Sequence, residues 1–153
     1  MKKLFQAIVF GLFALTFNTA AMAAPDQGSA AEASAMVKKA IAYIKTNGRE
    51  KAFAEFSNPN GQFRDRDLYI SVVDTKGKMM AHGVNPKLID KNLIDLKDTD
   101  GKYFVKDYVQ LASSKGSGWV DFKWPHPISK AVAQKSFFVE KMDDLVIGCG
   151  IYK

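Results

Sequence analysis

The sequence predicts an α+β fold in which a long N-terminal helix packs on an antiparallel sheet of about five strands. Apolar residues recur at helical spacing within residues 29–47, directly after a helix-capping sequence. Later runs are short, rich in β-branched and aromatic residues, and separated by turn sequences. Because the last three of these runs follow one another directly, antiparallel pairing is favoured.

The first 23 residues have the features of an export signal. Lys2 and Lys3 precede an apolar run over residues 4–17, and Ala21-Met22-Ala23 provides a small-residue cleavage site. As a helix this run covers about 21 Å, which is shorter than the hydrocarbon core of a bilayer at about 30 Å. Removal is therefore favoured over retention as an uncleaved anchor. We expect residues 24–153 to form one periplasmic domain.

The first helix is expected to begin at a capping box formed by Ser29 and Glu32. Asn47-Gly48 supplies a left-handed stop after about 17 residues. A shorter helical piece with Ala52, Phe53 and Phe56 on its apolar face ends at the turn sequence of residues 58–61.

A hairpin is expected next, with strands at residues 68–74 and 78–83 on either side of a tight turn. Residues 85–101 are mostly polar, so we predict a loop with one helical turn around 88–93. Phe104, Tyr108 and Leu111 then repeat at helical spacing, which predicts a second substantial helix between the glycines at 101 and 116.

Three strands complete the chain, at residues 119–124, 135–141 and 145–152. The first alternates strictly, so that Trp119 and Asp121 lie on one face with Lys123. The other face carries Val120, Phe122 and Trp124. Prolines end this strand, and two aspartates suit a hairpin turn between the last two strands.

Charge argues against a nucleic-acid partner. The chain has 22 basic and 16 acidic residues, and removal of the signal leaves 20 against 16, a net charge of +4. The lysines are spread along the chain and interleaved with aspartates, whereas a nucleic-acid binder concentrates them in one stripe.

No motif for catalysis, for a metal or for a cofactor is present. The two histidines have no nucleophile or metal-ligand pattern around them, and a single cysteine, Cys149, cannot form an internal disulfide. Cys149 is expected to be a buried packing residue between two glycines. Asp95, Asp98 and Asp100 are more typical of turns and caps than of a calcium loop. We therefore expect neither an enzyme nor a bound cofactor.

Aromatic residues gather on elements that a sheet and its covering helix would bring together. Aromatic walls with a few polar groups form small-ligand sites, although each such residue is more often plain core. Lys135 begins an apolar strand, where it could hold a carboxylate or could guard an edge strand against aggregation. The candidate ligand-binding residues are Tyr69, His82, Tyr103, Tyr108, Trp119, Asp121, Trp124 and Lys135.

Three stretches carry a family resemblance: residues 61–107, the segment GSGWVDFKWPHP, and the closing VIGCGIYK. In this order they resemble the single Cache domain family, type 2, from about Ile41 to the last residue. The Ala-His pair at 81–82 matches, as do Tyr103-Phe104 and the stretch from Gly118 to Pro125. Phe122 and Phe138 replace tyrosines of the family pattern, Gln134 replaces a proline, and Lys135 is kept.

The resemblance implies a PAS-like sensor fold whose sheet, loops and shorter helix enclose a small molecule. Family members typically recognise organic acids such as acetate, propionate, pyruvate or lactate, and usually form the outer part of chemoreceptors or histidine kinases. Because no transmembrane helix or output domain follows the predicted Cache domain, this chain looks like a free-standing periplasmic member of the family. The two missing hydroxyls imply a more apolar site.

Two functional hypotheses follow. In the first, a small carboxylate binds between sheet and helix and meets Lys135 and His82. In the second, the protein is an accessory subunit without a ligand, and its long helix contacts a membrane sensor protein or a second copy in a homodimer. Stabilisation of the folded protein by an organic acid distinguishes the two.

Overall fold

The computed structural model describes residues 26–153, so the predicted signal at 1–23 lies outside the described residues. The helices are α1 (Ala30–Asn47), α2 (Arg49–Phe56), the 3-10 helix η1 (Pro86–Leu88) and α3 (Phe104–Lys115). The strands are β1 (Arg64–Asp65), β2 (Leu68–Tyr69), β3 (Ser71–Asp74), β4 (Met79–His82), β5 (Ser117–Pro125), β6 (Val132–Met142) and β7 (Leu145–Tyr152). None of the helices within this range combines the length and apolarity that a bilayer crossing demands.

The main sheet has five antiparallel strands in the order β4-β3-β7-β6-β5, and a separate hairpin pairs β1 with β2. The long strands β5 and β6 run opposite each other from Ser117–Glu140 to Pro125–Val132. A bulge between Val72 and Val73 interrupts the pairing of β3 with β4. The predicted α+β class, with helices on an antiparallel sheet of five strands, is confirmed.

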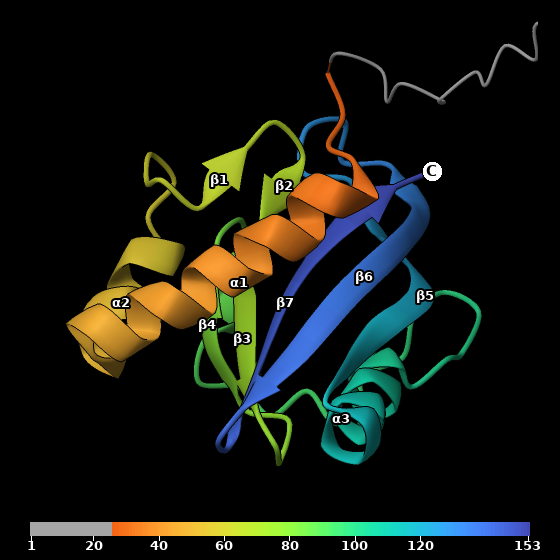
Figure 1. Ribbon diagram of the computed structural model, residues 1–153. Coiled ribbons are helices and arrows are strands. Elements are labelled where there is room, and N and C mark those ends of the chain that lie inside the picture. The colour runs from red at the N-terminus through yellow and green to blue at the C-terminus, as the bar shows by residue number, and fades with distance from the viewer. Residues whose placement is uncertain (1–25) are drawn as a thin grey trace, which may run out of the picture.

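The sheet separates two hydrophobic cores. α1 lies across one face of the sheet (Figure 1) and buries its apolar stripe against β7 residues such as Leu145 and Ile147. α3 packs on the other face, where Phe104 and Tyr108 meet Phe137 of β6. Strand alternation divides the side chains between the two cores. A residue's position along a strand therefore decides which core it joins.

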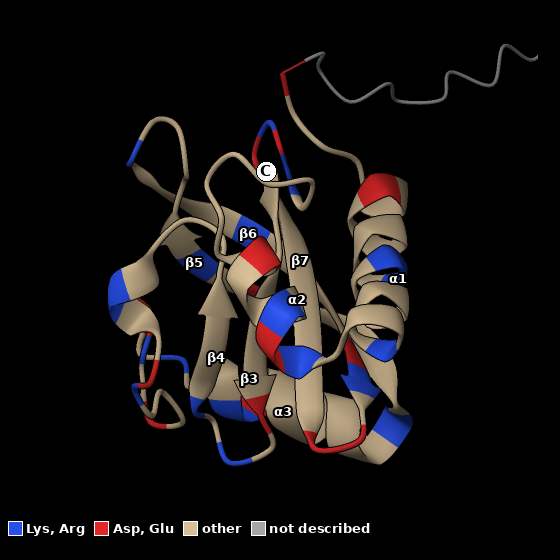
Figure 2. Ribbon diagram, turned by 90° about the vertical axis from the view of Figure 1, so that its left-hand side faces the viewer, with Lys and Arg blue, Asp and Glu red and all other residues tan. Residues whose placement is uncertain are grey.

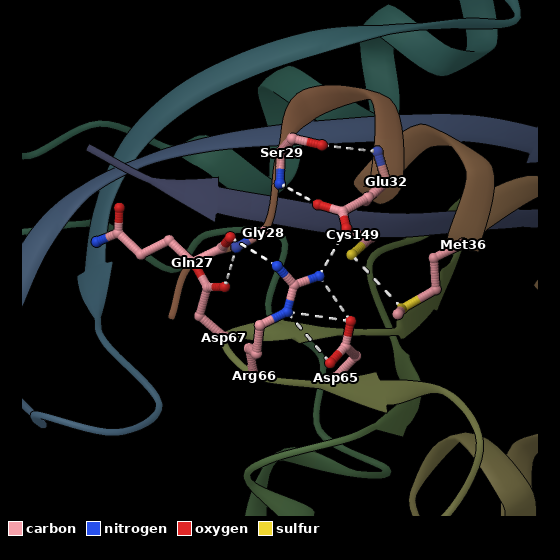
Figure 3. A network of polar contacts seen from close by, with 9 residues as sticks. All are labelled: Gln27, Gly28, Ser29, Glu32, Met36, Asp65, Arg66, Asp67 and Cys149. Carbon is pink, nitrogen blue, oxygen red and sulfur yellow. Dashed lines mark hydrogen bonds and ion pairs between the residues drawn. The ribbon is translucent and has the colours of Figure 1, made fainter. Parts of the chain in front are cut away.

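The start of α1 is tied to the β1–β2 turn by polar contacts (Figure 3). The capping box of Ser29 and Glu32 is present as predicted. The Gly28 amide donates to Oδ1 of the buried Asp67 at 2.6 Å. Arg66 donates to the Gln27 carbonyl at 2.8 Å and pairs with Glu32 at 2.7 Å. These contacts fix the segment before α1 against the hairpin.

The loops depart from the prediction in detail. The predicted strand at 68–74 is two strands, because β2 pairs with β1 whereas β3 pairs with β4 and β7. The predicted helical turn around 88–93 is instead η1, which begins at Pro86 after the Asn85 cap and is soon followed by Asp90 with a positive φ. β6 begins at Val132, before the predicted 135.

Charged residues of both signs are interspersed over the helices and loops, and Figure 2 shows no face of a single sign in that view. Arg49 at the start of α2 pairs with Asp143 and Asp144 in the turn between β6 and β7. Such exposed pairs contribute about 0–1 kcal/mol each. The charged groups that matter for a binding site are therefore the few that are buried.

Candidate functional site

The α3 face of the sheet carries a line of polar and aromatic side chains between its apolar residues. Lys135 and Phe137 of β6 point to this face, as do Phe122 and Trp124 of β5. His82 at the end of β4 completes the group. These positions follow from strand alternation, because Lys135 pairs with Phe122 and with Tyr152 across the two neighbouring strands.

An inner cavity of about 30 Å³ lies between this face, α3 and the loop after β4. Most of its wall is apolar, and its polar groups belong to the side chains of Ser71, His82, Tyr108, Trp124 and Lys135. Its lining residues are Ser71, Met79, His82, Leu88, Leu93, Phe104, Val105, Tyr108, Phe122, Trp124, Lys135 and Phe137. This is space for about one water molecule or one methyl group.

Lys135 is a buried ammonium without a counter-ion in contact. It is 2% exposed, and its Nζ donates to the Tyr69 hydroxyl at 2.7 Å. The Nζ lies 4.2 Å from the centre of the Tyr69 ring and within 5.2 Å of the Tyr152 and Phe137 rings. It takes part in none of the ion pairs of the described residues.

Burial controls the charge of this lysine. Removal from water lowers the pKa of Lys135 from 10.5 to about 7, against an opposing influence of the Asp67 carboxylate. A neighbouring anion favours the charged form of a lysine. A carboxylate placed beside Nζ would therefore raise this pKa and restore the full charge.

His82 is held as a neutral donor. Its Nδ1 accepts the backbone amides of Val84 and Asn85 at 3.1 and 2.9 Å, so the imidazole proton is assigned to Nε2. Burial, with Lys135 nearby, lowers the pKa of His82 to about 3. The ring lies against Tyr69, with centroids 5.1 Å apart.

An outer cavity of about 210 Å³ lies next to the inner one, and the two share His82 and Trp124 in their walls. The outer cavity is lined by Tyr69, His82, Val84, Asn85, Trp124, Pro125, His126, Pro127 and Lys130. Tyr69 lines the outer cavity and Lys135 the inner one, and these two residues are hydrogen-bonded. We call Tyr69, His82 and Lys135 the junction.

Five of the eight predicted site residues line these cavities: Tyr69, His82, Tyr108, Trp124 and Lys135. The alternative role of Lys135 as a guard on an edge strand is wrong, since β6 lies inside the sheet and the side chain is buried.

The other three predicted residues lie elsewhere. Trp119 and Asp121 point to the opposite face of β5, where Trp119 packs on Phe138 and Asp121 bonds to Ser136. Tyr103 is the residue before α3, is 40% exposed and lies under the Lys97 ammonium. The structure therefore does not bring these three to the two cavities, because Trp119 and Asp121 lie on the other face of β5 and Tyr103 precedes α3.

Two glycines that the sequence analysis did not assign to the site lie directly beneath two side chains that line the inner cavity, Phe137 and Lys135. Gly148 and Gly150 lie on the α3-facing side of β7, where they pair with Val139 and Phe137 of β6. A Cβ at Gly148 would overlap the Phe137 ring, and one at Gly150 would overlap the Lys135 side chain. Glycines at alternate strand positions mark a close approach from one side, and this signal is visible in the sequence.

The two phenylalanines that replace tyrosines of the family pattern have different positions. Phe122 lines the inner cavity and stacks on Phe104 with centroids 4.3 Å apart. Phe138 packs on the α1 side. Of the two hydroxyls that the resemblance counts as missing, only the one at 122 therefore bears on the cavity.

Metal and thiol chemistry find no support in the described residues. Residues 26–153 contain no group of three or more His, Cys, Asp or Glu side chains placed to hold a metal ion. Cys149 is fully buried on the α1 face, and burial raises the pKa of its thiol to about 12. The arrangement offers hydrogen-bond donors and a buried cation, which together suit a small anion.

Comparison with protein families places the chain among sensor domains. The family model described as Single Cache domain 2 matches residues 16–153. The chain is 33% identical over 90 residues to the methyl-accepting chemotaxis protein McpP of Pseudomonas putida. It is 30% identical over 89 residues to the sensor histidine kinase MctS of Rhizobium johnstonii. These matches cover 58% and 57% of this chain but 16% and 19% of the two relatives, respectively.

Solved structures show the same fold. A methyl-accepting chemotaxis protein of Vibrio parahaemolyticus is 32% identical with a TM-score of 0.67, over 80% of this chain and 86% of that one. The periplasmic sensor domain of a chemotaxis protein is 27% identical with a TM-score of 0.65, over 80% and 88%. A Cache chemosensory domain described for its carboxylic acid recognition is 25% identical with a TM-score of 0.65, over 80% and 86%.

Proposed function

The chain belongs to the single Cache domain 2 family, and on that premise we propose that it is a periplasmic sensor domain that binds a small organic acid. The proposed chemistry is binding without catalysis. The ligand carboxylate lies at the junction, where Lys135 supplies charge, the Nε2–H of His82 supplies a neutral donor, and Tyr69 accepts from Lys135 Nζ and holds it in place.

One observation carries this proposal: the Lys135 ammonium is buried with no carboxylate in contact. Burying a charge is costly unless it is paired, and a protein gains nothing in stability from leaving it so. A ligand carboxylate would supply the missing partner. The chain also shares its fold with a Cache chemosensory domain whose structure is described for carboxylic acid recognition. This likeness supports the same assignment.

The size of the inner cavity limits the part of the ligand that enters it. A volume of about 30 Å³ accepts one methyl group beyond a carboxylate at the junction. Larger substituents would extend into the outer cavity of about 210 Å³. We therefore propose acids of the size of acetate, propionate, pyruvate and lactate as the first ligands to test.

Thermal unfolding tests the proposal. A ligand that binds only the folded protein stabilises it by RT ln(1 + [L]/Kd), so a binding acid raises Tm in proportion to the logarithm of its concentration. Lys135→Met should abolish the rise. The matched control is Lys106→Met, which removes an exposed lysine of α3 and should leave the rise unchanged. A panel of acids, amino acids and amines that leaves Tm unmoved would refute ligand binding and favour the accessory-subunit alternative.

Location and partners form a second part of the proposal. We propose export with removal of residues 1–23, and a membrane sensor protein as the partner that reads the bound state, since the curated relatives are a chemoreceptor and a sensor kinase. The mass of the exported protein should correspond to a chain that starts at Ala24. Retention of the first 23 residues would contradict cleavage and support an uncleaved anchor.

A further inference from the structure

The two histidines of the chain have the same local arrangement. His82 is the last residue of β4, and its Nδ1 accepts the amides of the residues two and three positions later. His126 directly follows β5, and its Nδ1 accepts the amides of Ile128 and Ser129 at 3.2 and 3.3 Å. Both rings line the outer cavity.

A tyrosine supports each histidine ring. Tyr69 lies against His82, and Tyr152 lies against His126 with centroids 4.6 Å apart. The two tyrosine hydroxyls are 3.4 Å apart, and the Tyr152 hydroxyl donates to the Pro125 carbonyl at 3.0 Å. The two imidazoles therefore pack on two tyrosines whose hydroxyls contact each other.

The hydrogen bonds determine what these rings offer to a ligand. A nitrogen that accepts two amide N–H groups has its lone pair occupied, so each neutral imidazole carries its proton on Nε2. Neither Nε2 has a hydrogen-bond partner among the described residues. A metal ion would need the opposite arrangement, with the Nε2 lone pair free and Nδ1–H donating. The pair of rings therefore presents two N–H donors, which suit an anion.

The rest of the outer cavity agrees with an anionic guest. Asn85 and Lys130 add further donors, and the Lys130 ammonium folds back to donate to the Pro127 carbonyl at 2.6 Å. Within residues 26–153, the side chains that line this cavity include no Asp or Glu. The cavity is thus rich in donors and free of carboxylates.

We propose that the outer cavity is a second anion subsite, formed by His126 and Lys130, and that the preferred ligand is a short dicarboxylate. One carboxylate lies at the junction, and the other accepts from His126 Nε2 in the outer cavity. This inference rests on the proposed function, since it places a second group of the same ligand beside the first.

Two acids with the same four-carbon chain, succinate and butyrate, test the inference by calorimetric titration of the whole protein. Hydrogen bonds to a charged group are strong enough that succinate should bind about tenfold more tightly than butyrate. His126→Asn should reduce this ratio to about one and leave butyrate affinity unchanged. Asparagine can still accept the loop amide two residues on through Oδ1, so the turn is kept, while its shorter side chain leaves no donor at the position of the histidine Nε2. Lys130→Met, which leaves the histidine in place, should reduce the ratio partly.

The outcomes separate this inference from the proposed function. Equal affinity for succinate and butyrate, or a succinate preference that survives in both variants, would overturn the second subsite while leaving acid binding intact. Stabilisation by no acid at all would refute both. A titration with Zn²⁺ alone should show no binding. Tight Zn²⁺ binding that is lost in His126→Asn would overturn the assignment of the rings as donors.

Discussion

Replacement of Lys135 by methionine should make the unliganded protein more stable. The side chain is 2% exposed, and burial holds the pKa of its ammonium at about 7 instead of 10.5. At about 1.4 kcal/mol for each pKa unit, this difference corresponds to a cost of about 5 kcal/mol for keeping the folded protein charged. Methionine has a similar length and no charge, so it should pack in the same space.

The loss of one contact reduces the expected gain. The hydrogen bond from Lys135 to Tyr69 is removed, and a bond of this kind contributes about 1–3 kcal/mol. We therefore expect Lys135→Met to raise the free energy of unfolding by about 2–4 kcal/mol at about pH 6. Urea unfolding measures this, with Lys106→Met as the exposed control and with equal m-values as a check on the unfolded state.

The pH dependence provides the sharper test. Between about pH 7 and pH 10.5 the unfolded chain keeps a proton on Lys135 that the folded protein releases. The stability of the parent therefore rises with pH in this window, and its deficit against the variant shrinks by about 1.4 kcal/mol per pH unit. A variant that is less stable at about pH 6, or a gap that stays constant up to about pH 9, would show that water reaches the ammonium.

Three further predictions use the same site. Because a carboxylate ligand favours the charged form of Lys135, binding of the ligand should take up a proton, and calorimetry should show Kd rising from about pH 7 upward by up to about tenfold per pH unit. A Kd that is constant to about pH 9 would exclude Lys135 as the partner of the carboxylate. Phe122→Tyr adds a hydroxyl to the wall of the inner cavity and should change acid affinity, whereas Phe138→Tyr on the α1 side should not; equal effects in titrations of both variants would argue against this cavity. Gly150→Ala should lower the free energy of unfolding by about 1–3 kcal/mol and weaken acid binding, because the new methyl group displaces Lys135; a variant with parental stability in urea would contradict the close packing seen at this strand.

Local chemistry was enough to predict most elements of the fold. The capping box of Ser29 and Glu32 and the Asn47-Gly48 stop define α1, because both act within a few residues of the helix ends. Alternation likewise predicted the two faces of β5. The division of residues 68–74 between two strands was missed because it depends on which distant strand pairs with each half.

The site was predictable only in part, for a related reason. Alternation separates Trp119 from Trp124, but it does not say which face of the sheet holds the cavity. That choice is made by where α1 and α3 pack, which is set by tertiary structure. The burial of Lys135 depends on β6 lying inside the sheet, which the order of the strands decides. No local pattern marks His126 as a site residue, because the hydrogen bonds that fix its ring depend on the fold of the turn after β5.

The two glycines of β7 give the Phe137 ring and the Lys135 side chain a flat bed of main chain. Main chain has no rotamers, so neither side chain can move back toward the sheet to admit a bulkier guest. Under the proposed function, selection among acids of different girth must therefore come from the α3 and β5 side chains that line the same cavity. Engineering a new chemical preference into this protein should begin there, with Gly148 and Gly150 left unchanged.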